Sequence, residues 1–157
     1  MSARSVFAGL AATMLSVTPS PGDAASIRKE IAVAARPADV WAAVRDFGAV
    51  DKRLAPGFVV AVRLDGNVRE VTFANGTVAR ELLVSLDDDA RRLVYAVVGG
   101  RLTTHSASVQ VLADGDSGSR IIWISDFLPD QLTSYIDAQM NAAARVMKET
   151  LEHAAAK

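Results

Sequence analysis

The sequence has no cysteine, no clear excess of either charge and no apolar run as long as a membrane span. Without cysteine, its 157 residues form no disulfide bond, iron–sulfur cluster or thiolate nucleophile. Lysine and arginine number 17 against 18 aspartate and glutamate, so the basic excess of a nucleic-acid-binding domain is missing. The two histidines, His105 and His153, lack the spacing of a metal site. We therefore expect no nucleic acid partner, no metal and no cofactor.

Hydrophobic residues are abundant, at 50% of the chain, and part of them lies in an N-terminal segment of residues 1–25. Arg4 precedes an apolar stretch over 6–17, and a turn-forming segment then leads to Ala24, which is the order of a secretory signal peptide. We expect cleavage after Ala24 and one mature domain over 26–157, periplasmic or secreted, without a transmembrane segment. The alternative is an amphipathic N-terminal helix or a wrongly assigned start, with a cytoplasmic protein.

The remainder of the sequence predicts one strand, two short helices, six strands and a long helix. Alternation over 26–33 predicts the first strand, and Pro37 fits the first turn of a helix over 37–47, with a helical turn over 49–54. Apolar and β-branched runs predict strands over 58–64, 68–73, 77–86, 92–98, 103–112 and 120–127. Their connections, such as Asn75-Gly76, are too short for parallel crossovers, so the sheet is expected to be antiparallel.

The C-terminal segment 130–153 changes to a helical period. Asp130 is its expected N-cap. One apolar stripe runs along it, made of Leu132, Ile136, Met140, Ala143, Met147 and Leu151. Such a stripe has to be covered, and the sheet is the element available to cover it. The expected fold class is therefore α+β.

Several short phrases occur in an order that resembles a known family. They are Pro37-x-x-Val40-Trp41-x-x-x-x-Asp46-Phe47, Asn75-Gly76, Glu81-x-Leu83, Asp87-Asp88, Tyr95 and Ile122-Trp123-x-x-x-Phe127-x-Pro129. With them the chain from about residue 27 onward resembles the polyketide cyclase/dehydrase group of the SRPBCC superfamily, which also holds START-like and birch-pollen-allergen-like proteins. The resemblance implies a helix-grip fold, in which a curved seven-stranded sheet wraps the C-terminal helix around a hydrophobic cavity. It also implies a small hydrophobic ligand such as a lipid, quinone or polyketide, and only some members are enzymes.

Strand parity indicates which side chains face that cavity. In the strand over 103–112 one face carries His105, Ala107 and Val109, and in the last strand one face carries Trp123 and Phe127. With Tyr95 and the helix stripe, the expected ligand-binding residues are His105, Ala107, Val109, Tyr95, Trp123, Phe127, Ile136, Met140, Ala143 and Met147.

The polar candidates each have two interpretations. His105 is either a satisfied core side chain or a polar group that orients a ligand or transfers a proton. Glu81 is expected in a salt bridge at the rim or on the outer face; an inward Glu81 would need Arg63, Arg80, Arg101 or a hydroxyl as its partner. The Tyr95 phenol either hydrogen-bonds into the cavity or packs in the core.

Two features are expected to be structural. The acidic run 87–89 is typical of a solvated hairpin turn and not of a cation site. Trp41 and Phe47 are expected to attach the short helices to the sheet.

These patterns leave three functions open. The first is binding or carriage of a small hydrophobic ligand, and export favours it over catalysis. The second is a cyclase or dehydratase that uses His105 with Glu81 or Tyr95 as acid and base. The third is a protein-interaction module.

Overall fold

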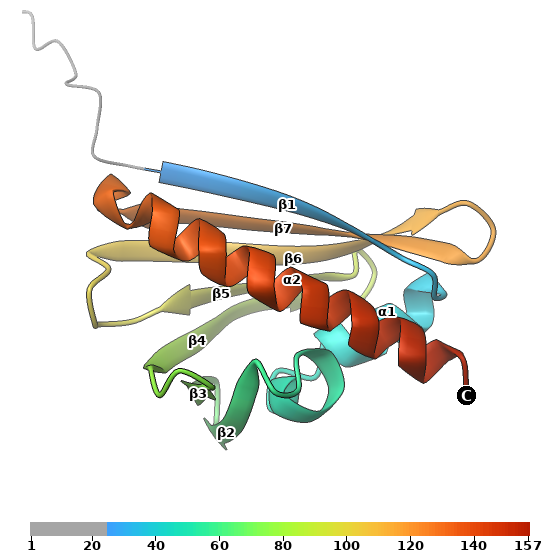
Figure 1. Ribbon diagram of the computed structural model, residues 1–157, viewed down its shortest axis with the longest axis horizontal. Coiled ribbons are helices and arrows are strands. Elements are labelled where there is room, and N and C mark those ends of the chain that lie inside the picture. The colour runs from blue at the N-terminus through green and yellow to red at the C-terminus, as the bar shows by residue number, and fades with distance from the viewer. Residues whose placement is uncertain (1–24) are drawn as a thin grey trace, which may run out of the picture.

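The computed structural model describes residues 25–157, a seven-stranded sheet with one long helix across it (Figure 1). The expected signal peptide and its cleavage site lie outside the described residues, apart from Ala25, which begins the first strand. No helix within the described part is long and apolar enough to cross a membrane.

Every neighbouring pair of strands in the sheet is antiparallel. The strand order is β1-β7-β6-β5-β4-β3-β2, so β1 pairs with the last strand and the other strands follow one another as a meander. The strands are β1 (Ala25–Val33), β2 (Val59–Asp65), β3 (Val68–Phe73), β4 (Val78–Asp87), β5 (Arg92–Val97), β6 (Thr104–Asp114) and β7 (Gly118–Leu128). The predicted helix-grip architecture is confirmed.

The long helix α2 (Thr133–Ala155) crosses one face of the sheet diagonally (Figure 1). Its buried residues are Met140, Ala143, Met147 and Leu151, four members of the stripe that the sequence predicted. The helix begins three residues later than expected. Asp130 opens the short turn η2 (Asp130–Leu132), and the N-cap position of α2 is Leu132, without a side-chain cap, so the predicted Asp130 cap is wrong.

The two short helical elements follow β1, as predicted. Helix α1 (Pro37–Val44) ends before Phe47, and η1 (Val50–Leu54) is a single wide turn. Phe47 is nevertheless buried, at 6% exposure, in the core cluster between helices and sheet. The expectation that it attaches this segment to the sheet is therefore confirmed.

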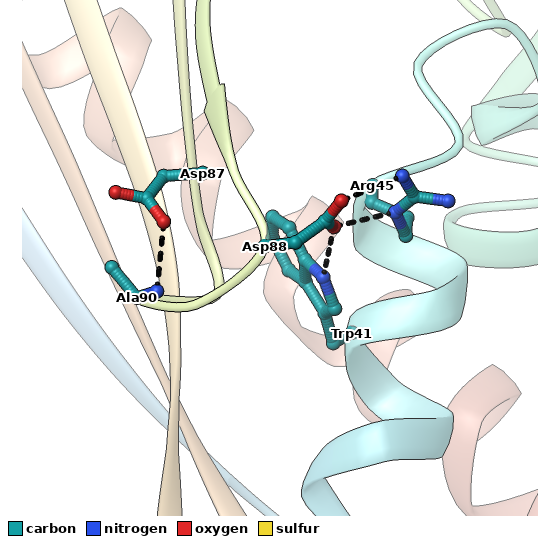
Figure 2. A network of polar contacts seen from close by, with 5 residues as sticks. All are labelled: Trp41, Arg45, Asp87, Asp88 and Ala90. Atoms are coloured by element: carbon teal, nitrogen blue, oxygen red, sulfur yellow. Dashed lines mark hydrogen bonds and ion pairs between the residues drawn. The ribbon is translucent and has the colours of Figure 1, made fainter.

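The acidic β4–β5 turn holds α1 against the sheet. Asp88 accepts a hydrogen bond of 2.8 Å from the indole Nε1 of Trp41 and two more from the Arg45 guanidinium, at 2.8 and 3.0 Å (Figure 2). These bonds, first that of Trp41 and then those of Arg45, lower the pKa of the Asp88 carboxyl. Asp87 accepts a bond from the Ala90 N–H, as in an ordinary turn. Residues 87–89 are exposed, as a solvated hairpin turn predicts, and Asp88 has in addition the contacts with Trp41 and Arg45, which the sequence did not predict.

Candidate functional site

A cavity of about 570 Å³ lies between the inner face of the sheet, α2 and the short helices. Eight of the ten predicted ligand-binding residues line it: Tyr95, His105, Val109, Trp123, Ile136, Met140, Ala143 and Met147. Ala107 and Phe127 are buried on the same face but do not border the space. Phe127 packs instead in a second apolar cluster with Ile27, Leu132 and Met140, which fills the region beside the cavity.

The wall of the cavity contains a buried ion pair. Arg69 of β3 and Glu81 of β4 are direct cross-strand partners, with side chains 10% and 7% exposed. Arg69 Nε and Nη2 both contact Glu81 Oε2, at 2.7 and 2.5 Å. The expectation that Glu81 points outward or lies at the rim is wrong. Its partner is also none of the arginines that the sequence suggested, because the β3–β4 register places Arg69 opposite it.

Each nitrogen of the Arg69 guanidinium contacts a protein group. Its Nη1 donates to the Phe47 carbonyl oxygen at 2.7 Å, and its guanidinium carbon lies 3.9 Å from the centroid of the Phe47 ring. The Tyr95 ring centroid is 5.6 Å from the same carbon. A charge taken out of water is costly unless it is paired and hydrogen-bonded, and Arg69 meets both conditions. The loop after α1 is thus tied to β3 by a charge in the cavity wall.

A signal for Arg69 exists in the sequence. The Asn75-Gly76 turn closes the hairpin, with Gly76 at a φ of +82° and Thr77 N–H donating to Asn75 Oδ1. In this hairpin each residue of β3 faces the residue of β4 at the same distance from the turn, so the two residue numbers of every pair sum to 150. Arg69 therefore pairs with Glu81. The same parity places Arg69 beside the buried Val71 on the inner face.

Tyr95 is buried next to this pair, on β5. Burial raises the pKa of its phenol, and the Glu81 charge adds to the rise while Arg69 opposes it. The phenol therefore stays protonated at any physiological pH. The indole N–H of Trp123 lies beside it and also opposes the rise, but within residues 25–157 it reaches no partner in hydrogen-bond geometry.

Both ring nitrogens of His105 are engaged. Nδ1 accepts a 2.9 Å hydrogen bond from the Val97 N–H, so the proton of the neutral ring is on Nε2, which donates to Ser125 Oγ at 3.1 Å. Burial lowers the pKa of His105, although nearby Asp126 opposes this. The side chain bridges β5 and β7 just beyond the last paired residues of β5 and β6, Tyr95 and Ala107. This geometry favours a neutral structural histidine over a proton-transfer group.

A family model matches residues 24–157, a range that includes all of the described chain. Its description is polyketide cyclase / dehydrase and lipid transport. The chain belongs to this family. Membership of this family and the helix-grip fold together show that the protein has a hydrophobic-ligand-binding type of fold. No curated protein sequence matches the chain significantly.

Solved structures share the fold of this family member. XoxI from Bacillus cereus is 17% identical with a TM-score of 0.73, over 81% of this chain and 95% of that one. Norcoclaurine synthase from Thalictrum flavum, a point mutant in complex with a transition-state analogue, is 17% identical with a TM-score of 0.64, over 82% and 94%. A Thermobifida fusca protein is 32% identical with a TM-score of 0.62, over 76% and 90%.

The family member's cavity has few groups that could do chemistry. Within residues 25–157 no cluster of three His, Asp or Glu side chains could hold a metal ion. Of the candidate acid–base residues, Glu81 and Tyr95 are neighbours in the wall, whereas the His105 nitrogens are bonded to Val97 and Ser125. The remaining lining is mostly apolar, from β3, β5, β6, β7 and α2.

Proposed function

We propose that the protein binds and carries a small, largely apolar ligand in the cavity between the sheet and α2, without turning it over. The observation that carries the proposal is the cavity itself, about 570 Å³ and walled mainly by aliphatic and aromatic side chains. Its volume lies within the range of about 300–1,000 Å³ that small-molecule sites occupy. Methionines on α2 suit irregular ligands because their side chains are flexible and polarisable.

Two alanines of α2 give a matched test of this proposal. Ala143 is buried and lines the cavity, whereas Ala138 is exposed on the same helix. We expect Ala143→Leu to fill ligand space and weaken binding of the neutral apolar dye Nile red by at least tenfold, while Ala138→Leu leaves it unchanged. Equal effects of both substitutions, or no binding by the unaltered protein, would exclude the cavity as a binding site.

Native mass spectrometry identifies the natural occupant. Protein purified from its own host is expected to retain an organic molecule that denaturation releases. Ala143→Leu protein from the same host should carry less of it, and Ala138→Leu protein the same amount. A retained molecule that does not depend on Ala143 would contradict the proposed site.

A cyclase or dehydratase activity is the second candidate, and the closeness of Glu81 and Tyr95 in the cavity wall is the observation in its favour. General acid–base catalysis needs two titratable groups within hydrogen-bond reach of one substrate position. Both ring nitrogens of His105 are already in hydrogen bonds, which argues against His105 as the acid or base of that reaction. If Tyr95→Phe abolishes conversion of a polyketide substrate, catalysis replaces carriage as the function.

We also propose export, on the signal-peptide pattern of residues 1–25. A carrier outside the cytoplasm would move its ligand between or toward membranes. Cell fractionation followed by N-terminal sequencing tests this: a periplasmic or secreted protein that starts at Ala25 is expected. An intact N-terminus in the cytoplasmic fraction would contradict it.

A further inference from the structure

The polar atoms left free in the cavity wall restrict the chemistry of the ligand. Each nitrogen of Arg69 contacts a protein group: Nε and Nη2 contact Glu81 Oε2, and Nη1 contacts the Phe47 carbonyl. Glu81 lines the cavity, and its contacts with Arg69 both use Oε2, which leaves Oε1 as the carboxylate oxygen that Arg69 does not hold. A free carboxylate oxygen accepts hydrogen bonds and donates none.

The Tyr95 hydroxyl lies on the same face of the sheet. Glu81 pairs with Val97 and Leu83 with Tyr95, so Glu81 and Tyr95 are diagonal neighbours on β4 and β5. Diagonal neighbours on one face are about 7–8 Å apart at the backbone, within reach of one small group placed between their side chains. The phenol is protonated, so it both donates and accepts.

The charge of the wall also selects among ligands. Arg69 and Glu81 neutralise each other, and the guanidinium is held by Glu81 and by the Phe47 carbonyl, which leaves one further N–H on each of Nη1 and Nη2. A carboxylate ligand placed between Glu81 Oε1 and Tyr95 would lie beside the like charge of Glu81, whose counter-charge Arg69 is already paired, and like charges at short range are unfavourable. A hydrocarbon would fit the apolar lining but would leave Glu81 Oε1 without a donor.

We infer that the ligand is a neutral, largely apolar molecule with a hydroxyl or phenol group, whose O–H donates to Glu81 Oε1 and whose oxygen accepts from Tyr95. The inference rests on the proposed binding function and narrows it to apolar alcohols and phenols. Free fatty acids and unsubstituted hydrocarbons are disfavoured inside the cavity.

Three probes of the same ring size separate these classes: 2-naphthol, naphthalene and 2-naphthoate. We expect the full chain at pH 7 to bind 2-naphthol about tenfold more tightly than naphthalene, the effect of one hydrogen bond to a charged acceptor. 2-Naphthoate, which is ionised at this pH, is expected to bind at least tenfold more weakly than 2-naphthol. Competition with Nile red measures all three affinities.

Fluorescence reports the hydrogen bond directly. Excited 2-naphthol is a strong acid, so its hydroxyl proton passes to a hydrogen-bonded base, leaving naphtholate and a protonated carboxyl group. We expect the bound probe to emit as naphtholate when Glu81 is present. A probe that is merely enclosed by apolar side chains emits as neutral naphthol.

Variants of the wall complete the test. Because Glu81→Gln alone leaves a buried arginine without its counter-charge and so destabilises the fold, the double variant Arg69→Met/Glu81→Leu replaces the pair with apolar side chains. We expect it to lose most of the preference for 2-naphthol over naphthalene and all naphtholate emission, and Tyr95→Phe to reduce the preference by a smaller factor, about twofold to threefold. Glu70→Gln, on the outer face of β3, is the control without effect.

The outcomes distinguish the inference from the function beneath it. If naphthalene or Nile red binds but 2-naphthol has no advantage, or the double variant keeps that advantage, the hydroxyl inference is wrong and carriage of apolar ligands stands. Tighter binding of 2-naphthoate than of 2-naphthol also overturns the inference. If neither Nile red nor any of the three probes binds, the proposed function fails, and the inference with it.

Discussion

Arg69 and Glu81 face each other across β3 and β4, and their ion pair is enclosed in the wall of the cavity. The pair joins β3 and β4 to the loop that contains Phe47, because the same guanidinium also donates a hydrogen bond to the Phe47 carbonyl. Its position gives an apolar site one fixed carboxylate, the charge of which Arg69 neutralises. Both stability and ligand choice follow from this arrangement.

Breaking the pair from one side should be more costly than removing it. We expect Glu81→Gln to lower the free energy of unfolding by about 3–5 kcal/mol, since a buried guanidinium loses its counter-charge. The double variant Arg69→Met/Glu81→Leu is expected to be about as stable as the unaltered protein. Urea unfolding measures both, with Glu70→Gln as a surface control within about 0.5 kcal/mol. A double variant as unstable as Glu81→Gln, or less stable, would contradict this expectation.

His105 should make stability depend on pH near neutrality. Because burial lowers its pKa in the folded protein, the unfolded chain, with a pKa of about 6.5, binds more protons at mildly acidic pH. The stability that neutral His105 provides is therefore present above about pH 6.5 and is lost as the pH falls toward its folded pKa.

The check is a comparison of urea midpoints between pH 8 and pH 5. We expect the unaltered protein to lose more stability over this interval than His105→Gln, which has no titrating ring. An equal change of the urea midpoint in both proteins would mean that His105 has the same pKa in the folded and unfolded states, and that the hydrogen bond from the Val97 N–H does not keep it neutral. Because the second histidine, His153, is exposed, it contributes equally to both proteins.

Loss of the Asp88 carboxylate should change the fluorescence of Trp41. We expect Asp88→Asn to weaken the hydrogen bonds to the indole and to Arg45, lowering the thermal midpoint and shifting the emission of Trp41, one of two tryptophans. The pKa of Asp88 is lowered, so its contribution is present above the ordinary aspartate range and is lost as the pH falls below it. Asp89→Asn in the same turn is the matched control, and an identical response from it would contradict the specific role of Asp88.

The periodic parts of the chain were predicted well because each depends on local geometry. Alternation placed His105, Val109 and Trp123 on the inner face, and steps of three and four placed Met140 and Met147 toward the sheet. The outward assignment of Glu81 was wrong because a charged side chain was assumed to prefer water. Its partner on the neighbouring strand removes that preference, and the partner depends on register.

The start of α2 and the contacts of Asp88 also depend on tertiary structure and not on nearby residues alone. Asp130 is a good cap by type, but the chain first makes the η2 turn, and the helix begins only at Thr133. Asp88 has the composition of a turn residue, and only the approach of α1 gives it Trp41 and Arg45 as partners. Neither outcome is contained in the spacing of nearby residues.

The sequence by itself determined the order of elements and the face that most of the apolar side chains take, because periodicity and turn residues act over a few positions. The tertiary structure decided which inward residues border empty space. Ala107 and Phe127 face inward but not onto the cavity, whereas Arg69 and Glu81 do border it. A cavity is the space that side chains from distant segments fail to fill, so its outline and its free polar atoms arise only when β3, β4, β5 and α2 are packed together.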